Sequence, residues 1–158
     1  MATQVVDHSA LKVNQTGIVA TVLLSFLLSF WGRPGLLLIP ALAVVLLLGT
    51  FDPKLALFKQ LYFKVLMPRG IVKPRLVADR PEPHNFAQGM GGVVTAVASV
   101  LVFFPLLTGE FRQNPVEVIG LALSLIVAVL AFVNLAFGYC VGCQIYFQLG
   151  RAGWIKAS

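Results

Sequence analysis

The chain has 158 residues, of which 58% are hydrophobic and only 11% are charged, whereas a soluble domain carries about 25% charged residues. With its mean hydropathy of +0.89, this composition excludes an ordinary soluble domain, and the length is too short for a membrane domain plus a soluble enzyme domain. The net charge of +6 does not indicate nucleic-acid binding, because basic residues in so apolar a chain mark the cytoplasmic loops of a membrane protein.

Four apolar runs predict four transmembrane helices. They cover about residues 13–31, 36–51, 89–107 and 116–137. Crossing the hydrocarbon core takes about 20 residues of helix, and only a helix satisfies the backbone of such a segment internally. We therefore predict an all-α fold: a four-transmembrane-helix bundle that forms a single membrane domain over residues 1–158.

Two further helices and one loop are expected outside the spans. Asp52 and Pro53 suit the N-cap and first position of a helix, and apolar residues recur after them at spacings of three and four. This pattern predicts an interfacial amphipathic helix over about residues 53–67. The prolines that follow predict an irregular cytoplasmic loop over residues 68–88, and a short helix is expected over about 143–150.

The basic residues lie mainly on one predicted side of the membrane. Ten of the 12 lysines and arginines precede the first span, join the second span to the third, or follow the fourth. Only Arg33 and Arg112 fall in the two opposite loops. Because short basic loops stay in the cytoplasm, we predict a multi-pass protein of the cytoplasmic (inner) membrane with both termini cytoplasmic.

The chain also carries a faint internal repeat. Asp7–Gly17 and Asp79–Gly89 each begin with an aspartate, contain a histidine and a glutamine, and lead into two apolar runs. This pattern favours two parallel halves, each made of a polar lead-in and two spans. The alternative interpretation is that any cytoplasmic entry into a span is polar.

The only two cysteines, Cys140 and Cys143, lie in the stretch C-V-G-C at the end of the fourth span. At i and i+3 of a helix their Cβ atoms would be about 5–6 Å apart, which is near disulfide range. We predict that they are the catalytic pair of a thiol- or sulfur-handling protein, by dithiol–disulfide exchange or by persulfide carriage.

Where the fourth helix ends decides how reactive these cysteines are. A break at Gly138 or Gly142 would place Cys143 at the start of a new helix, where a thiolate is stabilised. An unbroken helix would favour simple packing, since cysteine is a small apolar residue. In the reducing cytosol a reactive pair is expected to rest as the dithiol.

Five polar residues are predicted to support the pair. Arg80, Glu82, His84 and Gln88 precede the third apolar run, and Asn134 is the most polar residue deep in the fourth span. More ordinary roles compete with this prediction: a surface ion pair of Arg80 with Glu82, a solvated His84, or an interhelical hydrogen bond from Asn134.

A metal site is a competing use of the cysteines, but we predict no metal ligands. Two thiolates are too few for tetrahedral zinc, and adding His84 and His8 matches no known zinc-finger spacing. A copper(I) site on two thiolates is chemically reasonable, although no methionine-rich tract supports it. The cofactor stays open, since a quinone or a metal at the cysteine pair is compatible with the sequence.

Three motifs give the chain a family resemblance. They are V-D-x-x-x-x-K/R-V-x-Q (Val6, Asp7, Lys12, Val13, Gln15), R-P-x-x-x-x-F-A-Q (Arg80, Pro81, Phe86, Ala87, Gln88) and C-x-G-C (Cys140, Gly142, Cys143). With them the chain resembles a family of small bacterial four-helix integral membrane proteins catalogued as a domain of unknown function. It is also distantly similar, at the level of fold, to DoxX-type proteins, some of which are linked to thiosulfate oxidation or thiol redox balance. These resemblances imply an architecture rather than an activity.

Two other functions stay open beside thiol chemistry. One is a small transporter or channel subunit for a sulfur species or another small anion, and the other is a non-catalytic membrane scaffold for a soluble partner. The expected partners are the lipid bilayer and a soluble thiol or sulfurtransferase protein, without nucleic acid. A homo-oligomer is compatible with the sequence.

Overall fold

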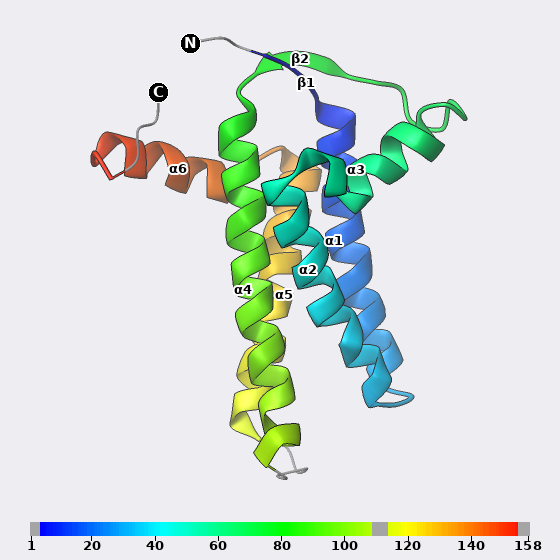
Figure 1. Ribbon diagram of the computed structural model, residues 1–158, viewed down its shortest axis with the longest axis vertical. Helices are drawn as coiled ribbons and strands as arrows, with labels where there is room; N and C mark the ends of the chain where they lie inside the picture. The colour runs from blue at the N-terminus through cyan, green and yellow to red at the C-terminus, as the bar shows by residue number, and fades with distance from the viewer. Residues whose placement is uncertain (1–3, 109–113, 155–158) are drawn as a thin grey trace.

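The computed structural model describes residues 4–108 and 114–154, in which four long helices lie side by side as a bundle (Figure 1). They are α1 (His8–Ser29), α2 (Leu38–Phe51), α4 (Pro81–Thr108) and α5 (Pro115–Phe137). All four are long and apolar enough to cross a membrane, when α2 is counted with the short helix η1 (Arg33–Leu37) that leads into it. The predicted all-α fold with four spans is therefore confirmed, and the chain is a membrane protein.

Small residues let the helices of the bundle approach closely. A Cβ added to Gly120 on α5 would lie 2.8 Å from the carbonyl oxygen of Ala98 and 2.9 Å from the backbone nitrogen of Val102 on α4. The two backbones are therefore in contact, as is common between membrane helices. The largest fully buried aliphatic side chains come from α1 and α2: Val22, Ile39, Leu42 and Leu46.

Two short strands join the beginnings of α1 and α4. Strand β1 (Gln4–Asp7) pairs antiparallel with β2 (Leu76–Asp79), in a register that sets Gln4 opposite Asp79 and Asp7 opposite Leu76. Figure 1 shows this ribbon lying across one end of the bundle. It fixes the lead-ins to α1 and α4 side by side, although they are about 70 residues apart in sequence.

The expectation of an irregular loop over residues 68–88 is wrong from residue 76 onward. Residues 76–79 form β2, and α4 begins at Pro81 rather than at 89. Pro81 and Pro83 are tolerated there because the first turn of a helix has backbone N–H groups with no intrahelical partner, so their loss costs nothing. Helix α1 also begins earlier than expected, at His8, because the carboxylate of Asp7 caps it by accepting a hydrogen bond from the backbone of Ser9.

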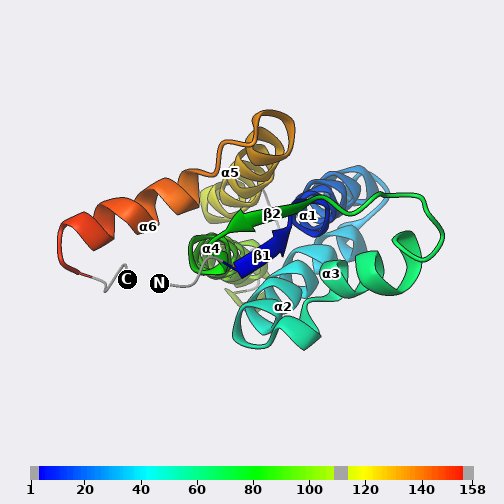
Figure 2. The same cartoon turned by 90° about the horizontal axis from the view of Figure 1, so that it is seen from above.

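The segment expected as one interfacial helix over 53–67 consists of three successive helical pieces. They are η2 (Pro53–Leu55), α3 (Leu57–Leu61) and the π-helical η3 (Tyr62–Leu66). The short helix expected at 143–150 is α6 (Val141–Arg151). It runs across the direction of the long helices and projects outward from the bundle (Figures 1 and 2). Exposed Tyr139, Phe147 and Trp154 flank or lie on it, which suits a helix at the membrane interface.

The ribbon, α3 and α6 all lie at the same end of the bundle (Figure 1). Most of the basic residues belong to segments at this end, and the stretch from residue 52 to 80 carries the majority of them. At the opposite end Arg33 lies 3.8 Å from Glu117, at the start of α5. The charge asymmetry read from the sequence therefore corresponds to two ends of one bundle.

Replacing Tyr62 with phenylalanine should destabilise this end of the protein. The Tyr62 side chain is fully buried, and its hydroxyl donates a 2.7 Å hydrogen bond to the Asp7 carboxylate. That carboxylate also accepts from the backbone N–H groups of Ser9 and Arg75. Hydrogen bonds to charged groups contribute about 1.5–3 kcal/mol, so Tyr62→Phe should lower the thermal midpoint in detergent by several degrees.

Tyr139→Phe is the matched control, because Tyr139 is 54% exposed and surface changes of this kind alter stability by less than about 0.5 kcal/mol. Equal midpoints for the two variants would contradict a stabilising role for the bond between Tyr62 and Asp7.

Candidate functional site

The fourth long helix breaks at Gly138, and this break creates the cysteine site. Helix α5 ends at Phe137, and Gly138 adopts φ 69°, in the left-handed region, with its N–H donating to the carbonyl oxygen of Asn134. Glycine is the residue that takes this cap conformation most readily. Of the two possible breaks considered from the sequence, Gly138 is the real one, and Gly142 lies inside α6.

Cys140 and Cys143 form a disulfide at the start of α6, with Cα atoms 5.2 Å apart. Cys140 is the N-cap of this 11-residue helix, and its sulfur accepts a 3.2 Å hydrogen bond from the backbone N–H of Cys143. Cys143 is 7% exposed, whereas Cys140 is half-buried. The partial positive charge of a helix N-terminus stabilises a thiolate there, and Cys140 is the more exposed residue of the two.

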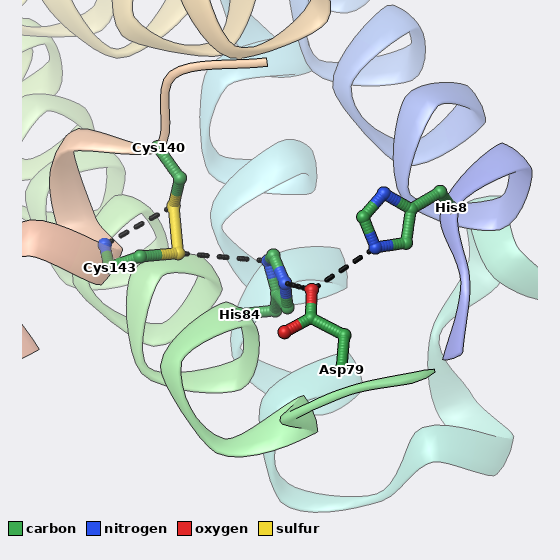
Figure 3. Close-up of a disulfide and its surroundings, with 5 residues drawn as sticks. All are labelled: His8, Asp79, His84, Cys140 and Cys143. Carbon is green, nitrogen blue, oxygen red and sulfur yellow. Dashed lines mark hydrogen bonds and ion pairs between the residues drawn. A yellow bond between two sulfur atoms is a disulfide. The ribbon is translucent and has the colours of Figure 1, made fainter. Parts of the chain in front are cut away.

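His84 links the disulfide to a carboxylate (Figure 3). Its Nδ1 lies 3.6 Å from the sulfur of Cys143, and its Nε2 lies 3.1 Å from Oδ2 of Asp79. An ionised carboxylate only accepts hydrogen bonds, so the neutral imidazole carries its hydrogen on Nε2. The lone pair of Nδ1 then points toward the sulfur, where it can take or return a proton.

Asp79 joins two histidines that come from different helices. Nε2 of His8, the first residue of α1, also lies 3.1 Å from Oδ2 of Asp79, and Oδ1 accepts a 2.7 Å bond from the backbone of Arg80. Burial acts to raise the pKa of Asp79, but the hydrogen bonds from His84, the Arg80 backbone and His8 outweigh it and lower the pKa below the ordinary 3.8. The carboxylate is therefore ionised at neutral pH and holds both rings in place.

The close approach of α6 to α4 puts the disulfide beside His84. A Cβ added to Gly142 would lie 2.5 Å from the Cβ and 2.8 Å from the Cα of Ala87. Only a residue without a side chain allows α6 to pass α4 at this distance. Ala87 is three residues after His84, one helical turn along α4, so this contact sets the distance between ring and sulfur.

A cavity of about 150 Å³ lies beside Cys140, which forms part of its wall. Its walls come from α1, α2, α4, α5 and α6, in the half of the bundle nearest α6. Four amide side chains line it together with Cys140: Asn14, Gln15, Gln88 and Asn134. The rest of the lining is mainly aliphatic. Gln88 is 8% exposed and donates to the carbonyl oxygen of Leu46.

Two groups of side chains in the described part of the chain are placed closely enough to hold a metal ion. They are His84 with Cys140 and Cys143, and His8 with Asp79 and His84. In each group the ligand atoms lie within 4.8 Å of one another. Each offers three ligands where structural zinc takes four, and cysteines joined in a disulfide have no thiolates to offer. His8 is grouped with Asp79 rather than with the sulfurs, so the considered set of two cysteines and two histidines is not assembled.

The supporting residues predicted from the sequence separate into different places. His84 contacts the disulfide, while Gln88 and Asn134 line the cavity beside Cys140. Glu82 is exposed in the first turn of α4, and Arg80 contributes its backbone N–H to Asp79. Asp79 itself was missed as a site residue. The available signal was its place in the faint repeat, where it corresponds to Asp7.

Comparison with known proteins matches one family to residues 6–151 of the chain, described as "Domain of unknown function (DUF4395)". The matched range contains all three sequence motifs, from Val6 to Cys143. No curated protein and no solved structure matches the chain. The distant likeness to DoxX-type proteins therefore stays a prediction.

Acid should weaken the cluster around Asp79. Because the pKa of Asp79 is lowered by folding, its contribution to stability is fully present above the ordinary value of 3.8 and is lost as the pH falls through the folded-state value. Asp79→Asn should therefore lower the thermal midpoint at neutral pH, and the difference from the wild type should shrink below about pH 4. Thermal melts in detergent across this pH range measure the difference.

Glu82→Gln serves as the control, since it changes an exposed carboxylate on the same helix. A difference between wild type and Asp79→Asn that stays constant from pH 7 to the acid limit would show that ionisation of Asp79 does not stabilise the fold.

Proposed function

We propose that this chain, which belongs to the DUF4395 family of unknown function, is an integral membrane protein that cycles Cys140 and Cys143 between dithiol and disulfide. The carrying observation is the position of His84, with Nδ1 3.6 Å from the Cys143 sulfur and Nε2 bonded to Asp79. A disulfide that only braces the fold needs no base held against one of its sulfurs, whereas a reactive pair does.

Cys140 is the sulfur that meets the partner. Cys140 is the more exposed residue of the two, and attack on its sulfur leaves the electron pair on Cys143, which is buried beside the imidazole. A partner thiolate forms a bond to the Cys140 sulfur while the bond between Cys140 and Cys143 breaks. The second thiol of the partner then attacks the mixed disulfide and releases Cys140 as a thiolate. The partner is oxidised by two electrons, and the pair is reduced by two.

His84 manages the proton at Cys143. When the disulfide opens, a protonated His84 delivers a proton from Nδ1 to the new thiolate. When the dithiol is oxidised, the neutral ring takes that proton back, and the charge of Asp79 stabilises the resulting imidazolium. Cys140 needs no such base, because the helix N-terminus and the N–H of Cys143 stabilise its thiolate directly.

The proposal includes the location and the partner. The basic end of the bundle, which carries α6, faces the cytoplasm of a bacterial inner membrane, as short basic loops do. The partner there is a soluble dithiol protein, or a sulfurtransferase if Cys140 carries a persulfide. The position of α6 supports access by a soluble protein, because the cysteines stand at the start of α6 and α6 lies at one end of the bundle (Figure 1).

Transport of a small sulfur species is a second candidate, favoured by one observation: Asn134 and Cys140 line the same cavity. However, the residues that line this cavity all belong to the half of the bundle nearest α6. A path through the membrane would have to be lined by residues along the whole length of the bundle. Uptake of thiosulfate into proteoliposomes separates transport from thiol exchange.

Redox titration of the purified protein tests the main proposal. The protein in lipid nanodiscs is equilibrated with mixtures of oxidised and reduced dithiothreitol, quenched with acid and labelled with a maleimide that adds mass. Both cysteines should change together, from two labels to none, because their sulfurs form one disulfide. Labelling of both cysteines that does not respond to the redox buffer would rule out the redox function, and would leave a membrane scaffold as the simplest alternative.

The two histidines provide a matched pair of variants for the proton step. Both bond to the same oxygen of Asp79, but only His84 contacts a sulfur. His84→Gln should slow reduction by dithiothreitol about 100-fold, the lower range for loss of a general acid or base. His8→Gln should keep the wild-type rate. If both variants behave alike, His84 acts only through the fold.

A further inference from the structure

We infer that the cavity beside Cys140 binds the ring of a lipid-soluble quinone, which takes the electrons from the reduced cysteine pair. This inference rests on the proposed thiol chemistry and names its electron acceptor. Cys140 belongs both to the disulfide and to the wall of the cavity, so a molecule in the cavity lies against the redox-active pair.

The size and lining of the cavity suit a single quinone ring. A cavity of about 150 Å³ lined by aliphatic side chains accommodates a benzene-sized molecule, and this one has that volume. Ile18, Val94 and Val127 supply apolar surface for the faces of such a ring. A quinone is apolar apart from two carbonyl oxygens, so it also needs a small number of polar contacts at its edge.

Amide side chains supply those polar contacts. Asn14, Gln15, Gln88 and Asn134 line the cavity from three different helices, and the amide nitrogen of each can donate a hydrogen bond to a carbonyl oxygen. The cavity wall carries no Asp, Glu, Lys or Arg among the described residues. A small inorganic anion or a charged metabolite would lack a counter-ion there, whereas a neutral molecule with two acceptors is matched.

The cavity is also reachable from the lipid. Three of its lining residues are substantially exposed on the apolar surface of α4 and α5: Met90 at 38%, Ile126 at 52% and Leu130 at 42%. These side chains face the hydrocarbon in a membrane-spanning helix. A ligand dissolved in the bilayer can therefore enter between them, while a soluble thiol approaches Cys140 from the interfacial side.

A single cysteine pair that has been reduced by thiols needs a two-electron acceptor before it can react again, and a quinone is one. Two S–H bonds break and one S–S bond forms, so two electrons and two protons must leave the pair. A quinone takes two electrons and, with two protons, becomes a quinol. The proton of Cys140 goes to water first, which forms the reacting thiolate, and the proton of Cys143 leaves through Nδ1 of His84 as the S–S bond forms. Alternating with a soluble dithiol, the pair would pass electrons from thiols to the quinone pool.

Anaerobic oxidation by a defined quinone tests this inference. The protein in nanodiscs is reduced, freed of reductant without oxygen, and mixed with decylubiquinone, whose fully substituted ring resists addition of thiols. One quinol should form per disulfide, at a rate that saturates with quinone concentration. Asn134→Leu should raise the half-saturating concentration about tenfold, as expected for a lost hydrogen bond.

Two further variants separate binding from folding. Gly91→Val should fill part of the cavity and slow the quinone reaction, because a Cβ at Gly91 meets only an ordinary contact with Val127 at 3.9 Å. Gln148→Leu removes an exposed amide from α6 outside the cavity and should react like the wild type. Gly91→Val and Gln148→Leu should keep the wild-type exchange rate with dithiothreitol.

The outcomes distinguish the two levels of the proposal. The quinone site would be overturned if the protein exchanges normally with dithiothreitol but forms no quinol, or forms it at a rate that does not saturate. Equal quinone kinetics in Asn134→Leu, Gly91→Val and wild type would overturn it as well. Each of these results would leave the thiol function standing. A pair that exchanges with neither reagent would overturn both.

Discussion

The left-handed turn at Gly138 is the constraint on which the candidate site depends. It ends α5 and redirects the chain across the end of the bundle, so that Cys140 becomes the N-cap of the next helix, α6. In an unbroken helix the N–H of Cys143 would be bonded to a backbone carbonyl, and both sulfurs would lie near the negative end of the dipole. The break reverses this local field, and the small size of Gly142 then lets α6 lie against α4 beside His84.

A second constraint comes from the two aspartates that end the strands. Asp7 and Asp79 occupy corresponding places, each at the end of a strand and just before a long helix. Asp7 caps α1 and accepts the Tyr62 hydroxyl, while Asp79 holds two imidazoles. The two segments that repeat faintly in sequence therefore have the same local structure, a strand that ends in an aspartate before a long helix, but different roles. Asp7 stabilises the packing at this end of the bundle, and Asp79 orients the imidazole that contacts the disulfide.

Hydropathy predicted the four spans well, because a backbone in lipid has few alternatives to a helix. The cysteines and His84 could be assigned to one side from the distribution of lysine and arginine alone. Asp79 could not be assigned to the site from the sequence, because its contact with His8 depends on the pairing of two four-residue strands. Strands this short are not recognisable from an alternating pattern of apolar and polar residues. The start of α4 was misplaced because Pro81 and Pro83 were taken to prevent a helix, although both stand where a helix tolerates them.

The pairing of β1 with β2 also limits the order in which the parts of the protein can come together during synthesis. His8 is made before Asp79 and His84, and the cysteines are made after both of these. The hairpin of α1 and α2 can enter the membrane early, but its lead-in finds a partner only when β2 has emerged. The sulfurs, in turn, meet the imidazole only after α6 has settled on α4. Sulfur chemistry assisted by His84 is thus withheld from the growing chain and becomes available when the bundle is whole.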